Sequence, residues 1–262
     1  MIDLNGRVVL VTGGNGGIGL GIAKGCVKAG ADVVIWGTNT DKLAVAEAQL
    51  NDDALQSAPM RTGGAGRVLA QRVDVRSEEE VVTSFAEAVS ALGKVDAVFA
   101  NAGVGEGAPF VEQTLELWRR VHSVNIDGAF LTLREGARHM IERGEGGSLV
   151  GVSSTSAIHG APRAQPYAVS KAGMLAMMRG LAVELARYGI RANSIIPGWT
   201  ETEMTEAGRQ NDKFLTNTTQ RTPVRRWGTP DDFEAVGAFL ADPTQSFLTG
   251  DEIVVDGGYT RF

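Results

Sequence analysis

The sequence predicts an α/β fold: a doubly wound parallel sheet of about seven strands with helices on both faces. Two observations predict this architecture. Short β-branched apolar runs alternate with helical patterns almost from the first residue, and each run is apolar at successive positions instead of at every second one. Strands buried on both faces, each followed by a helix, are typical of parallel sheets that helices cover. In such sheets ligands bind beyond the carboxyl ends of the strands.

The expected elements follow one another along the whole chain. The expected strands are residues 7–12, 31–36, 67–73, 95–100, 148–153, 191–196 and 253–255. The expected helices are residues 17–29, 41–50, 77–92, 115–143 and 167–188, the fourth with a break near residues 124–125. Another short helix follows Thr229-Pro230, where the missing N–H of proline costs nothing.

Polar residues mark the starts of helices and the loops. Asn39 or Thr40 is the expected N-cap of the second helix. Ser77 and Glu80 have the spacing of a capping box. Residues 51–66 contain Pro59 and three glycines, so we expect a surface loop there.

The chain carries no internal repeat, low-complexity tract or linker rich enough to divide it. We therefore expect a single domain over residues 1–262. Residues 199–227 are polar, rich in Thr, Arg and Gln, and without clear periodicity. A stretch of this length predicts a mobile lid or specificity loop over the site.

Composition excludes several classes of protein. Hydrophobic residues make up 43% of the 262 and charged residues 21%, with no apolar run of membrane-spanning length. The net charge of −6 argues against a nucleic-acid partner. The single cysteine, Cys26, excludes an internal disulfide and a thiolate metal cage. The first residues lack a basic segment followed by an apolar one, so we expect no signal peptide, no membrane association and a cytoplasmic protein.

Residues 12–19 (TGGNGGIG) form a glycine-rich turn between the first strand and the first helix. Glycines let the backbone turn sharply and approach a pyrophosphate at the N-terminus of the next helix. A tight connection alone would not need five glycines in eight positions, and no Lys-Ser/Thr pair follows as in nucleoside-triphosphate loops. This turn predicts a Rossmann-type dinucleotide site, with contacts from Gly13, Asn15, Gly17, Ile18 and Gly19.

The end of the second strand bears on the choice of nicotinamide cofactor. A carboxylate there would bind the ribose hydroxyls of NAD(H), and an arginine would bind the 2′-phosphate of NADP(H). The chain has Gly37, Thr38 and Asn39 instead, and Thr38 can donate a hydroxyl to a phosphate. The choice stays open, with a slight preference for NADP(H).

Tyr167 and Lys171 lie four residues apart, and hence on one face of a helix. A free tyrosine has a pKa of about 10, too high for a base near neutrality, and a nearby ammonium group lowers it. For the pair alone, a half-buried tyrosine beside a solvated lysine is the preferred interpretation. No His, Asp and Glu cluster has the spacing of metal ligands, so we expect no metal.

Several motifs accompany this pair in a fixed order. They are residues 12–19, Asp74-Val75, Asn101-Ala102-Gly103, Val124-Asn125, Ser153-Ser154, Tyr167 with Lys171, Pro197-Gly198 and Asp256-Gly257-Gly258. With them the chain resembles the short-chain dehydrogenase/reductase family over nearly its whole length. One departure is Ala100, where family members usually carry asparagine; we expect it to alter local packing only.

The resemblance implies an NAD(P)-dependent oxidoreductase that interconverts a secondary alcohol and a ketone. Tyr167 would be the general acid or base, Lys171 would lower its pKa and bind the nicotinamide ribose, and Ser154 would hydrogen-bond the reacting oxygen. Ser153 competes with Ser154, but the family spacing favours Ser154. Asn125 would hold a water that links Lys171 to solvent.

The resemblance also implies contacts with the cofactor and with other subunits. Asp74 and Val75 would meet the adenine, residues 101–103 (Asn101, Ala102 and Gly103) the adenosine ribose, and Pro197, Gly198 and Thr202 the nicotinamide end. Family members often form homotetramers, so a homo-oligomer is expected. The substrate is a small carbonyl or alcohol compound: a 3-oxoacyl thioester, a sugar or polyol, or a cyclic alcohol. A non-catalytic, NAD(P)-sensing partner-binding protein is the alternative from another functional class.

Several residues have two interpretations. His159 lines the substrate pocket or belongs to a plain loop, and Trp199 covers the substrate or packs within its loop. Arg209, Arg221, Arg225 and Arg226 form a basic patch for an acyl-carrier partner or are simply solvated. Met174, Met177 and Met178 belong to the core or to a subunit interface.

Overall fold

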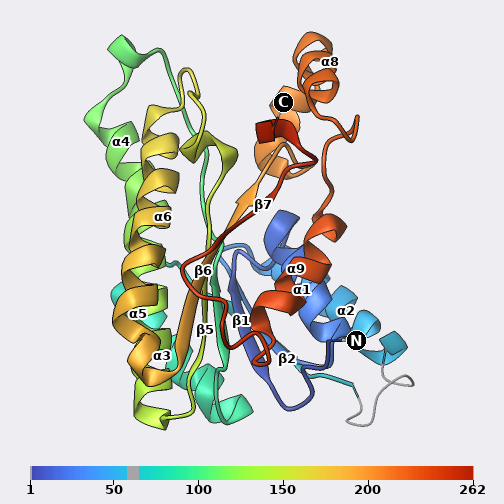
Figure 1. Ribbon diagram of the computed structural model, residues 1–262, viewed down its shortest axis with the longest axis vertical. Helices are drawn as coiled ribbons and strands as arrows, with labels where there is room; N and C mark the ends of the chain where they lie inside the picture. The colour runs from blue at the N-terminus through green and yellow to red at the C-terminus, as the bar shows by residue number, and fades with distance from the viewer. Residues whose placement is uncertain (1, 58–64, 262) are drawn as a thin grey trace.

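A parallel sheet runs through the centre of the protein. The computed structural model describes residues 2–57 and 65–261. In these residues seven strands pair in the order β3-β2-β1-β4-β5-β6-β7, and every pairing is parallel (Figure 1). This arrangement confirms the predicted fold class.

The observed strands lie within one or two residues of the expected segments. They are β1 (Val8–Thr12), β2 (Asp32–Gly37), β3 (Val68–Arg72), β4 (Ala97–Ala100), β5 (Gly147–Val152), β6 (Ile190–Pro197) and β7 (Glu252–Val255). The longer helices are α1 (Gly17–Lys28), α2 (Thr40–Ser57), α3 (Glu78–Leu92), α4 (Leu115–His122), α5 (Ala129–Arg143), α6 (Gln165–Leu185), α8 (Asp212–Arg221) and α9 (Glu234–Ala241).

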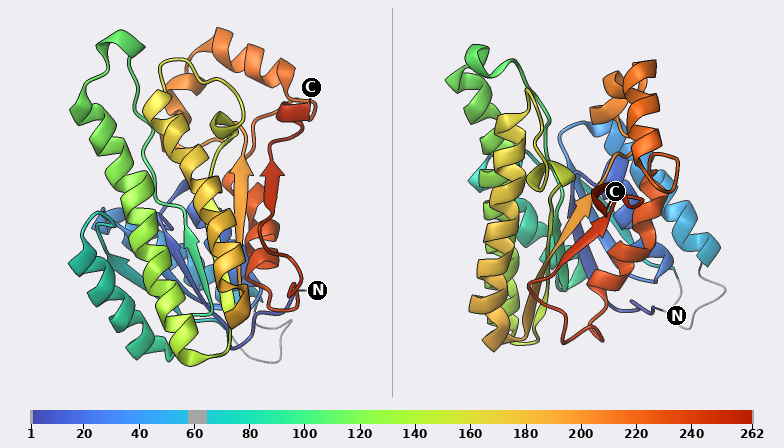
Figure 2. Two further views of the ribbon diagram at one scale, coloured as in Figure 1. Left: turned by 60° about the vertical axis from the view of Figure 1, so that its left-hand side comes forward. Right: turned by 45° about the horizontal axis from the view of Figure 1, so that its top comes forward.

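Helices cover both faces of the sheet. Helices α3, α5 and α6 lie on one face, and α1, α2 and α9 on the other (Figures 1 and 2). All five residues of β1 are buried, and they alternate between the layers: Val9 and Val11 pack in the core under α1, and Val8 and Leu10 in the core under α3 and α5. Because side chains alternate along a strand, a strand in the middle of such a sheet must be apolar at successive positions.

Helix α1 packs against the chain around α9 with almost no space between the backbones. A Cβ atom on Gly21 would lie 1.8 Å from the carbonyl oxygen of Pro230, and one on Gly25 would lie 1.9 Å from that of Glu234. Glycine at every fourth position from Gly17 to Gly25 puts these contacts on one face of the helix. The sequence carries this signal in the spacing of Gly17, Gly21 and Gly25, but only residues 12–19 were predicted to approach another group closely.

The expected end of α2 needs correction, and the choice between its two candidate N-caps is decided. Helix α2 continues to Ser57 instead of ending at Leu50, because Leu50 and Ala54 extend its buried face by one turn. The remainder of the expected loop, residues 58–64, lies outside the described residues. Asn39 is the N-cap, since its Oδ1 accepts a hydrogen bond from the Lys42 N–H at 3.0 Å.

The expected capping box of α3 is only half formed. Ser77 accepts a hydrogen bond from the Glu80 N–H at 3.2 Å, but the Glu80 carboxylate accepts from the N–H of Asp74 instead of from that of Ser77. At the expected short helix after Thr229-Pro230, Thr229 and Asp232 form a complete capping box over η7 (Pro230–Phe233), which leads into α9.

Residues 199–227 contain short helices instead of an aperiodic loop. They include η6 (Glu203–Thr205), α7 (Glu206–Arg209) and α8. Trp199 stacks on Trp227 with 5.3 Å between ring centroids, and the Phe214 ring meets both edge-on. The Trp227 Nε1 donates to the Thr218 hydroxyl at 2.9 Å. We call residues 199–227 the lid segment; its aromatic side chains give it a small core of its own.

The described residues contain neither a membrane-spanning helix nor a cluster of metal-binding side chains. No helix in residues 2–57 or 65–261 is long and apolar enough to cross a membrane. The same residues hold no group of three or more His, Cys, Asp or Glu side chains placed to bind a metal ion. Cys26 is fully buried in the core, which raises the pKa of its thiol.

The contact between α1 and α9 predicts that a methyl group on Gly25 cannot be accommodated. We expect Gly25→Ala to lower the free energy of unfolding by about 3 kcal/mol or more, because backbone atoms would have to move. Gly180→Ala is the matched control: Gly180 is an exposed helical glycine with open space around it, so we expect a gain of roughly 0.5–1 kcal/mol. Urea unfolding measures both, and equal stability of the two variants would contradict the close contact.

Candidate functional site

The predicted site residues gather at the carboxyl edge of the sheet. The glycine turn follows β1, residues 101–103 follow β4, Ser153 and Ser154 follow β5, and Gly198 follows β6. The strand order reverses direction between β1 and β4, where a crevice forms in doubly wound sheets. The lid segment rises above this edge (Figure 1).

The glycine turn has the geometry of an anion cradle. Gly13 and Gly17 have φ values of 63° and 51°, which favour glycine. Helix α1 begins without a side-chain cap and without an acidic residue in its first turn. A Cβ on Gly16 would meet nothing within 4 Å. The N–H groups around Gly17, Ile18 and Gly19 can therefore serve a phosphate group.

The Asn101 side chain stabilises this turn by a hydrogen bond to its backbone. Its Nδ2 donates to the carbonyl oxygen of Thr12 at 2.8 Å, and a Cβ on Gly19 would lie 2.4 Å from that nitrogen. The Thr12 hydroxyl accepts hydrogen bonds from the N–H groups of Asn101 and Ala102, both at 3.0 Å. The Asn101 amide thus supports the turn, and the contact of residues 101–103 with the adenosine ribose stays a prediction.

Three side chains form the candidate catalytic group. Tyr167 and Lys171 project from α6, and the Ser154 hydroxyl lies close enough to that of Tyr167 to affect its pKa. The Ser153 hydroxyl donates to the backbone oxygen of Lys171 at 2.8 Å and is buried. Of the two serines, Ser154 is therefore the one that faces the tyrosine.

The pKa shifts in this group differ from the expectation. Burial raises the pKa of Tyr167, and the hydrogen bond from Ser154 opposes that effect. Burial also lowers the pKa of Lys171 to about 8. The structure does not show the expected lowering of the Tyr167 pKa by Lys171: the Lys171 Nζ donates to the Val152 carbonyl at 2.8 Å and lies 5.6 Å from the centre of the Tyr167 ring.

Asn125 lies in a turn of π-helix, η3 (Ser123–Gly128), which joins α4 to α5 without the expected break. Its Oδ1 accepts from the Val104 N–H at 2.8 Å, and its Nδ2 donates to the Val104 oxygen and to the Ser170 hydroxyl. Both amide hydrogens are thus used within the protein. A Cβ on Gly103 would lie 3.3 Å from the Asn125 Oδ1 and from the Lys171 Nζ, so Gly103 separates the two polar groups.

Most of the residues expected at the adenine end of the cofactor contact neighbouring residues of the protein. A Cβ on Gly37 would lie 2.6 Å from the Asn15 amide nitrogen, which places Asn15 over the end of β2. Arg76 binds both carboxylate oxygens of Asp74 and lowers the pKa of this carboxyl. Val75 is buried and packs against Gly128. Thr38 is exposed.

The lid segment reaches the glycine turn and the tyrosine. A Cβ on Gly17 would lie 3.1 Å from the Thr202 Cγ2, so Thr202 adjoins the start of α1. Buried Pro197 ends β6, and the Gly198 N–H donates to the Val255 oxygen at 2.9 Å. Sequence reasoning missed Met204: a Cβ on Gly105 would lie 2.9 Å from its sulfur and 3.9 Å from the Tyr167 ring. Its position two residues after Thr202 was the available signal.

For most of the residues that had two interpretations, the structure shows which one holds. Trp199 packs within the lid segment, while His159 lines a surface pocket near the start of α6 and meets the Tyr259 ring edge-on. Met174 and Met178 are core residues. The four arginines of the lid segment all contact other residues. Arg209 forms ion pairs with Glu201 and Glu206, and Arg226 forms one with Asp232. Arg221 lies over the Tyr259 ring, and Arg225 donates a hydrogen bond to the Gln220 oxygen.

Comparisons with known proteins agree with this arrangement. A family model described as enoyl-(acyl carrier protein) reductase matches residues 13–260. An L-rhamnose 1-dehydrogenase (NAD(P)(+)) of Azotobacter vinelandii is 34% identical over 252 residues, covering 96% of each chain. A 3-oxoacyl-[acyl-carrier-protein] reductase of Chlamydia pneumoniae is 36% identical over 259 residues, covering 99% of each chain.

A solved structure matches over the full chain. It is a gluconate 5-dehydrogenase from Burkholderia cenocepacia J2315 in complex with NADP and tartrate. Its TM-score is 0.90 and its identity 33%, with 100% of this chain and 98% of that chain covered.

Proposed function

The chain belongs to the short-chain dehydrogenase/reductase family, and from that premise we propose that it interconverts a secondary alcohol of a sugar, sugar acid or polyol with the ketone, using Tyr167 as general acid and base. The protein is an NAD(P)-dependent oxidoreductase that acts on alcohol or ketone groups. The observation that carries the proposal is the placement of Ser154 and buried Lys171 beside Tyr167, at the edge where α1 begins uncapped.

Each side chain in the group has a distinct task in this proposal. The Tyr167 hydroxyl gives its proton to the carbonyl oxygen during reduction and removes it during oxidation. Ser154 donates a hydrogen bond to the same oxygen as negative charge develops on it. The bound nicotinamide supplies or accepts the hydride. Lys171, with a pKa of about 8, can hold a proton near Tyr167 at neutral pH.

We assign Asn125 a positioning role. Its amide clamps both backbone groups of Val104, which fixes Gly103 beside Lys171. Both of its side-chain hydrogens are already used, so a relay water beside Lys171 cannot accept a hydrogen bond from the Asn125 side chain.

For the cofactor, we propose a preference for NADP(H). The end of β2 carries no carboxylate to repel a 2′-phosphate. Lys42 lies in the first turn of α2, and Arg72 pairs in register with Gly37. Lys42 forms an ion pair with Glu203 of the lid segment, which a phosphate group could replace. These cations, together with the exposed Thr38 hydroxyl, supply the charge that a 2′-phosphate needs.

A polar substrate is supported by the lid segment. Arg209 and Arg226 are already bound to carboxylates, which weakens the case for a basic patch that attracts an acyl-carrier protein. Two of the similar proteins are named for L-rhamnose and gluconate. Reduction of a 3-oxoacyl thioester is the second candidate, because a relative named for it is 36% identical.

The assembly and location are also proposals. We propose a single catalytic domain, a cytoplasmic location and a homo-oligomer, with the tetramer favoured by the family. Exposed apolar side chains on α4 and α5, among them Leu115, Trp118 and Phe130, support an oligomer because they would be buried between subunits.

A substrate panel tests the proposed function. We expect kcat/KM for sugars, sugar acids or polyols to exceed that for 3-oxoacyl thioesters by at least about 100-fold, or about 2.7 kcal/mol. Tyr167→Phe should lower kcat by roughly 10²–10⁴-fold while cofactor binding persists, because only the proton transfer is lost. The reverse preference would make the protein a thioester reductase, and an unchanged rate in Tyr167→Phe would remove Tyr167 from the chemistry.

The pKa shift of Tyr167 predicts a pH dependence. Oxidation needs the deprotonated phenol, so its kcat/KM should rise with pH below the pKa of Tyr167. Ser154 lowers that pKa, so Ser154→Ala should raise it and move the rising limb to higher pH, in addition to slowing the reaction. Ser156→Ala is the control, since only the backbone N–H of Ser156 contacts Ser154. A profile in Ser154→Ala that keeps its midpoint would contradict the assignment.

Lys42 gives a test of cofactor choice. We expect Lys42→Gln to weaken NADPH binding by about tenfold and to leave NADH binding unchanged, because only NADPH carries the 2′-phosphate. Lys213→Gln, which alters an exposed lysine of α8, is the control. Nicotinamide fluorescence at fixed salt measures both affinities. Equal effects of Lys42→Gln on the two cofactors would refute the role of this lysine.

A further inference from the structure

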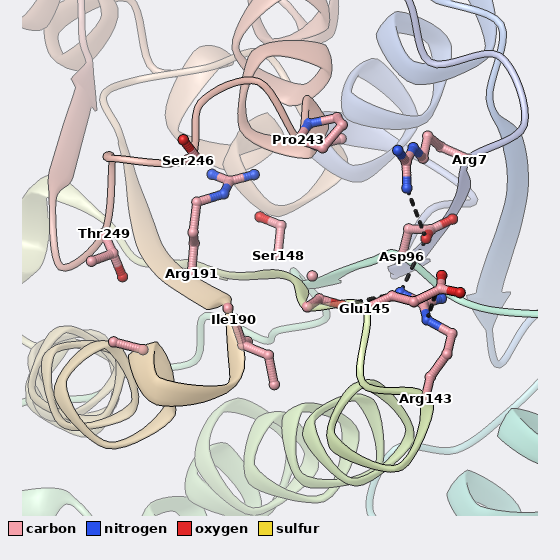
Figure 3. A pocket seen from close by; sticks show the side chains of 15 residues that line it. Arg7, Asp96, Arg143, Glu145, Ser148, Ile190, Arg191, Pro243, Ser246 and Thr249 are labelled. Atoms are coloured by element: carbon pink, nitrogen blue, oxygen red, sulfur yellow. Dashed lines mark hydrogen bonds and ion pairs between the residues drawn. The ribbon is translucent and has the colours of Figure 1, made fainter.

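A second pocket opens at the opposite edge of the sheet from the candidate catalytic group. It has a volume of about 220 Å³. Its walls come from the first residues of the central strands: Arg7 precedes β1, Asp96 precedes β4, Ser148 lies in β5 and Arg191 in β6. The chain between α9 and β7 closes the other side. We call this space the basal pocket; Figure 3 shows it.

Arg191 is the unusual residue of the basal pocket. It is only 6% exposed, and its Nη2 donates to the carbonyl oxygens of Leu240 and Asp242 at 3.0 and 3.1 Å. Its Nη1 is buried and has no hydrogen-bond partner among the described residues. Figure 3 shows the guanidinium group on one side of the pocket and the cluster of Arg7, Asp96 and Arg143 on the other. A buried guanidinium nitrogen without a partner is costly, and an anion would relieve that cost.

The charges around the basal pocket leave a positive excess. Asp96 is shared by three cations, with N–O distances of 3.4 Å to Arg7, 3.3 Å to Lys94 and 3.1 Å to Arg143. Arg143 also meets Glu145 at 3.3 Å, and Asp242 lies near Arg191. The charged side chains that line the pocket are thus three arginines (Arg7, Arg143 and Arg191) and two carboxylates (Asp96 and Glu145), and Arg191 forms no ion pair within the described residues.

Hydroxyl groups complete the wall near Arg191. The Thr249 Oγ1 accepts a hydrogen bond from the Ala192 N–H at 3.0 Å, which leaves its own proton for another acceptor. Ser246 lies exposed at the rim of the pocket. We propose that the basal pocket binds a small oxyanion, a carboxylate or phosphate group, with the Arg191 Nη1 and the Thr249 hydroxyl as donors. A planar guanidinium group matches the paired oxygens of such anions.

Thermal unfolding with sodium phosphate, at constant ionic strength balanced with sodium chloride, tests this proposal. The protein is saturated with NADPH, so that the glycine turn is already occupied. We expect a saturable rise in Tm of about 2–4 °C at a tenfold excess over Kd, because the ligand binds only the folded state. A parallel titration with sodium acetate separates the sources: a rise with both anions indicates a general oxyanion site, and a rise with phosphate alone indicates a phosphate site.

Three variants assign the effect to the basal pocket. Arg191→Met should abolish the rise, and Ser246→Glu should abolish it by placing a carboxylate at the rim beside Arg191. Because Ser246 is exposed, the second variant decides the matter where Arg191→Met does not fold. Arg138→Met, at an exposed arginine of α5, should respond like the wild type. No saturable rise in the wild type, or an undiminished rise in Ser246→Glu, would overturn the proposal.

Discussion

The close approach of backbones along α1 is the constraint on which the site depends. Gly13 and Gly19 hold the turn against the Asn101 amide, Gly17 adjoins Thr202, and Gly21 and Gly25 touch the carbonyl groups of Pro230 and Glu234. A single helix therefore fixes β4, the start of the lid segment and the chain before α9. Any side chain at these positions would push apart the elements that must meet at the cofactor.

Burial sets the chemistry of the catalytic group. Low polarity disfavours the charged form of both residues, so it raises the pKa of Tyr167 and lowers that of Lys171 to about 8. The two pKa values therefore move apart, so that Lys171 gives up a proton at lower pH than Tyr167 does. Burial is the larger effect on the Tyr167 pKa, and the hydrogen bond from Ser154 opposes it by favouring the phenolate. The Lys171 Nζ donates to the Val152 carbonyl, and Ser154, not Lys171, supplies the lowering of the Tyr167 pKa.

Much of the fold could be predicted from the sequence, because buried parallel strands and their turns leave local patterns. The expected first strand, residues 7–12, and the observed β1 (Val8–Thr12) differ by one residue. Spacing placed Tyr167 and Lys171 on one face of α6, but it could not show where the lysine chain turns, and the sign of the tyrosine pKa shift was therefore wrong. The helices of the lid segment were not predicted, because their core consists of three aromatic rings that are far apart in the sequence.

The lid segment is held together by contacts between its own residues. The Gly228 N–H donates to the Trp199 oxygen, and the Glu201 N–H donates to the Gly228 oxygen, so its two ends are tied together. Its ion pairs are exposed and contribute little, whereas the rings of Trp199, Phe214 and Trp227 hold its helices as a unit. We therefore expect the segment to move as one body. Because Thr202 lies against Gly17 and Met204 lies near Tyr167, displacement of this body would alter the cofactor contact and the substrate contact together.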